Sequence, residues 1–108
     1  MMTKDTNFTT PPGHRGFLAK KLFAAAGTII DGSIARIEEN GGGPAEQHTH
    51  EHNHLFIVVE GEARILLGDG TVVVRENESF LVEGTTPHSV WNNAPRTTVM
   101  IGISVTRE

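Results

Sequence analysis

Apolar residues occur along most of this chain in short runs, which are separated by clusters of glycine, asparagine, aspartate and proline. The runs are about five to nine residues long and rich in valine, isoleucine, leucine and phenylalanine, a composition typical of β-strands. Many short strands joined by tight turns are characteristic of a β-sandwich or a β-barrel. The pattern therefore predicts an all-β fold.

Two segments show the strand pattern clearly. The sequence Gly-Asp-Gly at 68–70 separates the apolar runs 63–67 and 71–75, which predicts a β-hairpin. Over residues 99–105, valine and isoleucine alternate with methionine, glycine and serine. This period of two predicts a strand with one buried face.

The N-terminal part of the chain has a different character. Residues 1–16 are rich in threonine, proline and glycine, and we expect an extended arm, which either pairs with another subunit or frays. In residues 17–26, Leu18 and Leu22 have helical spacing, but we favour a strand. The predicted organisation is thus an N-terminal arm over 1–16 and a single barrel over 17–108.

Composition narrows the classes of function. The chain has 108 residues, a formal net charge of −4 and no cysteine. This length builds one modest core. The negative charge disfavours a nucleic-acid partner held by a basic surface, and the lack of cysteine excludes disulfides and thiolate chemistry. No apolar run reaches the ~18 residues of a membrane span, and the polar N-terminus does not resemble a secretory signal. We expect a soluble cytoplasmic protein.

Histidine is the residue type that indicates chemistry. Four of the six histidines lie close together, and a fifth follows a proline much later in the chain. These five are His48, His50, His52, His54 and His88. Neutral imidazole is the commonest biological metal ligand, so the cluster indicates a metal site. The alternatives are a solvated histidine-rich strand that binds metal adventitiously and a set of unrelated histidines on a polar face.

The spacing constrains which histidines can share an ion. Residues i and i+2 of a strand lie ~6.6 Å apart on one face, so His48 and His50 can chelate from one straight strand. On that strand His54 would lie ~20 Å from His48, too far for metal–nitrogen bonds of ~2.1 Å. Either His54 is not a ligand or the chain bends at 51–53. We expect the bend, with His52 at its apex as a non-ligand.

His88 has to reach this cluster from a distant strand. It follows the turn signal at 84–87, which delivers it to the start of a strand. Ligands from one strand, from a bend and from a distant strand face one another inside a curled sheet. A barrel provides such an interior, because its inward side chains converge.

These residues resemble the cupin superfamily, the small double-stranded β-helix or jelly-roll barrels. The first cupin motif reads glycine, five residues, His-x-His, three or four residues, usually glutamate, six residues and glycine. This chain matches every spacing with Gly42, His48, His50, His54 and Gly61, but a histidine stands where the family usually has glutamate.

The second cupin motif is matched less closely. The family pattern is Pro-x-Gly, a histidine after two residues and an asparagine after three more. Here Val82 replaces the proline and one extra residue precedes His88, whereas Asn92 follows at the family spacing. The resemblance covers roughly residues 30–105 and implies the cupin fold.

The resemblance implies that the metal ligands are His48, His50, His54 and His88. A histidine in place of the glutamate is similar to the four-histidine subset of single-domain cupins, which includes manganese-binding members. Four neutral ligands leave a divalent ion its full charge and, at an octahedral ion, two open positions. We expect one Mn²⁺ or Fe²⁺ per chain, although Zn²⁺, Ni²⁺ or Cu²⁺ would bind imidazoles at least as tightly.

Cupins of this shape include dioxygenases, isomerases, decarboxylases, sugar-binding modules and proteins without known activity. Our first hypothesis is a metal-dependent dioxygenase or isomerase that acts on a small dicarbonyl, enol or sugar-acid substrate. The alternative is a non-catalytic, metal-dependent module that binds a sugar or another small molecule. Candidate substrate-binding residues are Arg36, Phe56 and Trp91, and no catalytic base is evident. A homodimer is expected, because a short barrel has edge strands to protect.

Overall fold

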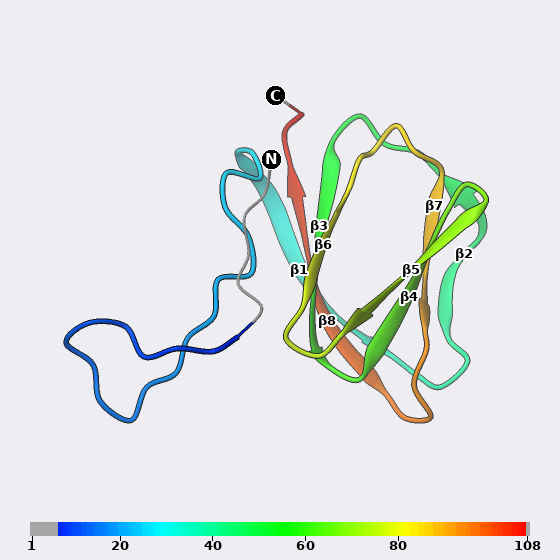
Figure 1. The fold of residues 1–108 in the computed structure, drawn as a ribbon. Coiled ribbons are helices and arrows are strands. Elements are labelled where there is room, and N and C mark those ends of the chain that lie inside the picture. The colour runs from blue at the N-terminus through cyan, green and yellow to red at the C-terminus, as the bar shows by residue number, and fades with distance from the viewer. Residues whose placement is uncertain (1–6, 108) are drawn as a thin grey trace.

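The structure is a computed structural model that describes residues 7–107, and the regular elements of this part are eight strands (Figure 1). In chain order these strands are β1 (Ile29–Ile37), β2 (Gly42–His48), β3 (Asn53–Glu60), β4 (Glu62–Leu67), β5 (Gly70–Arg75), β6 (Ser79–Val82), β7 (His88–Asn92) and β8 (Thr98–Val105). The expectation of an all-β chain is therefore confirmed.

The strands form two antiparallel sheets that lie face to face (Figure 1). One sheet has the order β1-β8-β3-β6 and the other has the order β2-β7-β4-β5. Strands that are consecutive in the chain repeatedly lie in opposite sheets, as in a double-stranded β-helix or jelly roll. This is the predicted fold class.

The predicted hairpin is present as β4 and β5. These strands are joined at Gly68 and Asp69, and Leu67 pairs with Gly70 across the turn. Gly68 has a φ of 58°, a left-handed conformation that glycine adopts without steric cost. The local turn chemistry therefore determined this pairing.

The core lies between the two sheets and is built from side chains of both. Its buried members are aliphatic except for one aromatic ring and one thioether. They are Phe56, Val58, Ala63, Ile65, Val74, Val82 and Met100. Burial of one such side chain is worth about 1.5–3 kcal/mol, and these residues come from β3, β4, β5, β6 and β8.

β8 differs from the expectation of a single buried face. The inward side chains of β8 include Met100 and Ser104, whereas the alternating valines and isoleucines face outward. Val99 and Val105 are nevertheless buried. At the end of the strand, Val105 is covered by the chain before β1 at Gly27, whereas Ile101 and Ile103 in the middle of the strand line a groove on the outer face.

The predicted strand over 17–26 is absent. Its one strand-like contact is an isolated bridge between Thr9 and Ala19. The segment lies outside the barrel (Figure 1), where the Ser79 hydroxyl donates to the Leu22 carbonyl. The backbone of Ala25 has a φ of 53°, a left-handed conformation that interrupts an extended strand.

Asn92, the asparagine of the second motif, is a buried hub of hydrogen bonds. Its amide nitrogen donates to the carbonyls of Ile37 and Arg96, at 2.9 and 2.7 Å. Its amide oxygen accepts from the Thr98 hydroxyl and the Ala94 N–H, at 2.7 and 2.8 Å. This residue joins the end of β1 to the β7–β8 connection.

Within the described range 7–107, no helix has the length and apolar character required to cross a membrane.

Candidate metal centre

His48 and His88 form a cross-strand pair. His48 is the last residue of β2, His88 is the first residue of β7, and the two are register partners. Their ring centroids lie 4.6 Å apart. His88 is almost completely buried, with 1% of its surface exposed. The turn before β7 thus delivers His88 to the start of a strand, beside the first cluster histidine.

His50 lies beyond the end of β2, in the link to β3, so it does not share a straight strand with His48 as expected. The two rings are still close, with centroids 4.3 Å apart. The His50 N–H donates to the carbonyl of Gly84 at 2.8 Å. The chain then bends at residues 51–52, which confirms the predicted bend.

Gly84 holds this bend by close backbone contact. Its N–H donates to the side-chain oxygen of Asn53 at 3.0 Å. A Cβ on Gly84 would lie 2.6 Å from the His50 carbonyl oxygen and closer still to that of His52. Glycine is therefore required at this position for steric reasons, whereas the sequence alone indicated it only as part of a turn and a motif.

His54 reaches the interior from β3. It pairs with Ser104 on one side and Val82 on the other. Its ring stacks on Phe56, with centroids 4.9 Å apart and planes at 28°. Its Nε2 lies 3.3 Å from the Ser104 hydroxyl oxygen. These contacts fix the ring and leave Nδ1 facing away from Ser104.

The cluster histidines form two overlapping groups, and each group has three ligand nitrogens within 4.8 Å of one another. We call His48, His50 and His88 the inner triad, and His50, His52 and His54 the mouth triad. His50 belongs to both. The structure therefore brings three of the four expected ligands into one group, and His54 is linked to that group through His50, together with His52.

Four imidazole nitrogens indicate whether a cation can bind at this site. Among the described residues, the buried side-chain polar atoms without a hydrogen-bond partner are all imidazole nitrogens. They are Nδ1 of His48, Nε2 of His50, Nδ1 of His54 and Nε2 of His88. Leaving a buried polar group unpaired costs about 1–3 kcal/mol. A metal ion that accepts these lone pairs removes the penalty, so the four residues fit a divalent cation.

The hydrogen bond of His88 fixes its tautomer. Nδ1 lies 2.7 Å from the carbonyl oxygen of Thr86, which can only accept, so Nδ1 carries the proton. The Nε2 lone pair is then free to bind a cation. Orientation of a ligand histidine through its other ring nitrogen is a common feature of metal sites.

Electrostatics favours the neutral form of three of the cluster histidines. Burial, together with the nearby His88, lowers the pKa of His48. Burial and the neighbouring histidines also lower the pKa of His50. For His54, burial and then His52, His50 and His88 lower the pKa to about 4, against a smaller opposing effect of Asp31. Neutral imidazole is the form that binds metal.

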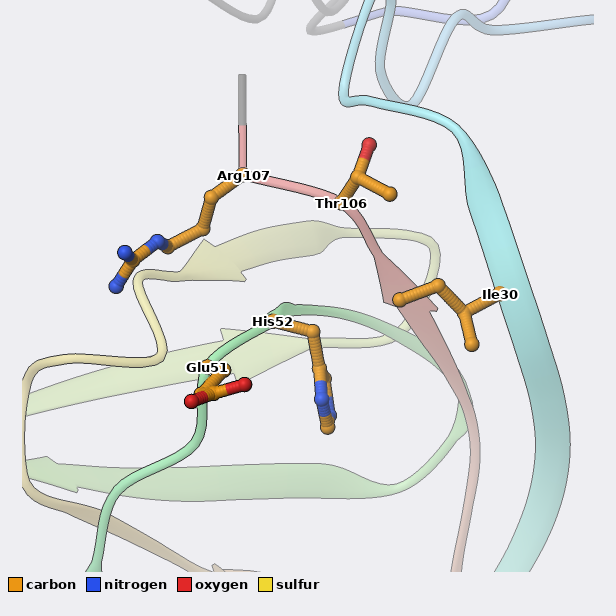
Figure 2. Close-up of a pocket in the computed structure, with 5 residues that line it drawn as sticks. All are labelled: Ile30, Glu51, His52, Thr106 and Arg107. Carbon is orange, nitrogen blue, oxygen red and sulfur yellow. The ribbon is translucent and has the colours of Figure 1, made fainter.

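A pocket of about 590 Å³ lies at this end of the barrel (Figure 2). Its lining comes from β1, from the bend and from the chain after β8: Ile30, Glu51, His52, Thr106 and Arg107. His52 connects it to the cluster, because the His52 ring stacks on His50 at 4.8 Å. No local pattern marked Arg107 or Thr106, because only the tertiary fold brings the end of β8 to the bend.

The three candidate substrate-binding residues lie in different places. Phe56 is buried in the core and touches His54. Arg36 is exposed on β1, and as the register partner of Val99 it shares the outward face. Trp91 donates from Nε1 to the Ser89 hydroxyl at 3.0 Å, on the side of β7 opposite to His88. Of the three, only Phe56 is brought to the histidine cluster.

Metal-free protein should lose stability as the pH falls. Histidines titrate near 6.5 in the unfolded chain, but the folded pKa values of His48, His50 and His54 are lower. The unfolded state therefore binds more protons below about pH 6.5, and folding weakens towards pH 4. His54 is only half-buried, so solvent screening reduces its contribution to the loss to on the order of 2 kcal/mol. Urea unfolding of chelator-treated protein between pH 7.5 and 4.5 measures it.

The variant His54→Gln should show a smaller loss over the same pH range. His14→Gln is the matched control, because His14 lies in the N-terminal segment, and it should keep the wild-type slope. Equal slopes for the His54→Gln variant and the wild type would contradict this prediction.

Comparison with known proteins supports the fold. A family model described as a cupin domain matches residues 33–105. No curated protein matches the sequence. The cupin domain of a transcriptional regulator of the XRE family from Enterobacter cloacae is similar, with a TM-score of 0.64 and 15% identity, and the match covers 72% of this chain and 82% of that one.

Two further solved structures are similar at low identity. A conserved protein of unknown function from Streptococcus pyogenes has a TM-score of 0.62 at 17% identity, over 71% of this chain and 64% of that one. The cupin domain of Cnp3 from Schizosaccharomyces pombe has a TM-score of 0.63 at 12% identity, and the match covers 70% of this chain and 52% of that one. This chain thus matches less than two thirds of the length of these two. With the matching family model and the two-sheet fold, the chain belongs to the cupin family.

Proposed function

We propose that this protein is a metal-dependent small cupin that holds one divalent cation through His48, His50, His54 and His88. The observation that carries the proposal is the set of four buried imidazole nitrogens without hydrogen-bond partners. The neutral, nitrogen-only donor set suits Mn²⁺ or Fe²⁺, and Zn²⁺, Ni²⁺ or Cu²⁺ would bind at least as tightly.

We propose an enzyme of the dioxygenase or isomerase type, acting on a small oxygenated substrate such as a dicarbonyl, an enol or a sugar acid. The cation would supply Lewis-acid stabilisation of negative charge on a substrate oxygen. The chain itself supplies orientation: the Thr86 carbonyl fixes His88, and Ser104 and Phe56 fix His54. Apolar walls beside His54, which include Val82, exclude water from the interior.

The pocket next to the cluster supports a polar substrate. Its lining combines an apolar side chain with hydroxyl, imidazole, carboxylate and guanidinium groups. A binding module for apolar ligands would instead need aromatic walls, but Trp91 lies on the outer face of its sheet and Phe56 is part of the core. In this pocket Arg107, and not Arg36, is placed to pair with a substrate carboxylate.

Metal binding can be measured directly. Chelator-treated protein titrated with Mn²⁺ should bind one ion per chain. The variants His48→Gln, His50→Gln and His88→Gln should each bind Mn²⁺ at least about 100-fold more weakly, because each removes one ligand nitrogen from the ion. Calorimetry and elemental analysis give affinity and stoichiometry. His14→Gln is the control, and unchanged binding by the three variants would refute the centre.

Turnover separates the enzyme from the binding module. Protein loaded with Mn²⁺ or Fe²⁺ should convert a dicarbonyl or phenolic substrate, and comparison of aerobic with anaerobic assays distinguishes oxygenation from isomerisation. The His88→Gln variant should lower kcat/KM by at least about 100-fold, because metal is lost. Metal-loaded protein that binds such compounds but converts none of them would support the alternative.

That alternative is a non-catalytic, metal-dependent module for a sugar or another small molecule. The similarity to the cupin domain of a transcriptional regulator favours it, because such a domain can act by binding alone. In that case the same histidines would hold the ion and the pocket would bind the ligand.

We also propose a homodimer that forms through the outer face of the β1-β8-β3-β6 sheet. Ile29 and Ile34 are 67% and 68% exposed, and together with Ile101 and Ile103 they line one apolar groove. An exposed apolar patch of this kind is typical of an interaction surface.

Sedimentation at micromolar concentration should show a dimer. Ile34→Glu should shift it to monomer, because a charge would be buried in the contact. Thr71→Glu, exposed on the opposite sheet, is the control. A monomeric wild-type protein would contradict the dimer.

A further inference from the structure

His52 contacts the histidine cluster without belonging to the expected ligand set. Its ring stacks on His50, with centroids 4.8 Å apart and planes at 17°. Its centroid also lies 5.2 Å from that of His54. The ligand nitrogens of these three residues lie within 4.8 Å of one another, so the mouth triad has the geometry of a metal site.

The two triads cannot both hold an ion through neutral His50. A neutral imidazole has one protonated nitrogen and one lone pair, whichever tautomer it adopts. His50 is shared by the inner triad and the mouth triad. An ion at one position therefore excludes an ion at the other, and the two positions are alternatives for a single cation.

The triads differ in access to solvent. In the inner triad, His88 is 1% exposed. In the mouth triad, His52 lines the pocket at the end of the barrel (Figure 2), where Glu51 and Arg107 are the charged groups. A hydrated cation that enters through this pocket thus meets His52 before it can reach His88.

We propose that the mouth triad is the loading site of the metal centre: a hydrated divalent cation binds first to His50, His52 and His54, and then moves inward as His52 is exchanged for His48 and His88. This inference rests on the proposed function, because it assumes that the inner position is where the ion finally resides. His50 and His54 stay bound throughout, and each imidazole that binds releases one water to solvent.

Stepwise exchange has a clear physical advantage. Moving a bare ion from water into a low-dielectric interior costs many kcal/mol, and direct transfer to the inner triad would remove most of the hydration before new ligands are in place. With the mouth triad, three imidazoles replace water while the ion is still at the solvent-exposed end. The loading site therefore lowers the barrier in both directions, and it leaves the final affinity unchanged.

The test is the kinetics of metal loading in the full-length protein. Co²⁺, whose visible absorption reports imidazole coordination, is mixed with chelator-treated protein in a stopped-flow instrument, and release is followed by mixing the loaded protein with excess chelator. For His52→Gln, both loading and release should slow by about tenfold, because a ligand is lost from the transient state alone. The dissociation constant should stay within about threefold of the wild-type value.

Two further variants make the comparison specific. His52→Ala should reproduce the effect of His52→Gln, because neither side chain offers an imidazole. His14→Gln, a histidine outside the cluster, should load and release at wild-type rates. Circular dichroism verifies that each variant is folded.

Three results would overturn the loading site. Unchanged rates in both His52 variants would show that His52 is not on the path. A dissociation constant weakened by more than tenfold, with faster release, would make His52 a ligand of the final centre. Two tightly bound Co²⁺ ions per chain would show that the triads fill together.

The proposed function fails differently. If wild-type protein binds no Co²⁺, both the four-histidine centre and the loading site are contradicted. If wild-type protein binds one Co²⁺ but the His52 variants load and release it at wild-type rates, the four-histidine centre is supported and only the loading site is wrong.

Discussion

The metal centre of this barrel depends on the burial of imidazole nitrogens that no protein group hydrogen-bonds. Each unpaired nitrogen costs about 1–3 kcal/mol, and four of them meet at one end of the interior. Such a cluster stays ordered because the opposite edges of the rings are anchored: His88 on the Thr86 carbonyl and His54 on Ser104. The penalty in the metal-free state and the affinity for a cation have the same origin, so the site links metal binding to stability.

The position of the cluster follows from the connection between the two sheets. β2 belongs to one sheet and β3 to the other, so the link at 49–52 has to cross the end of the barrel. This link packs closely against Gly84, in the turn before β7. One backbone contact therefore places His50 above the cross-strand pair of His48 and His88. The same contact turns His52 towards the mouth, so the inner and mouth triads arise from one bend.

Much of this could be predicted from the sequence, because turn chemistry and histidine spacing are local. The hairpin at 68–70, the bend before β3 and the start of β7 at His88 needed only neighbouring residues. The side of each strand that faces inward is a property of the whole fold. Periodicity showed that residues 99–105 alternate, but not that the valines and isoleucines would face outward. For the same reason Arg36 and Trp91 could not be assigned to a face, and Arg107 gave no local signal.

Histidine at position 54, in place of the family's usual glutamate, changes the charge of the centre. A glutamate would raise the pKa of neighbouring imidazoles through its negative charge, whereas the pKa of the imidazole at position 54 is itself lowered, by burial and then by His52, His50 and His88. The neutral form of His48, His50 and His54 is favoured in the metal-free protein, and a divalent cation bound by neutral ligands keeps its whole charge. Charge compensation must then come from outside the ligand set, either from carboxylates near the cluster such as Asp31 and Glu51 or from the bound molecule itself. Asp31 and Glu51 contribute no ligand to either triad, so an anionic oxygen on the bound molecule would neutralise the ion most directly. Under the proposed function, the neutral ligand set thus favours acids and enolates over neutral sugars.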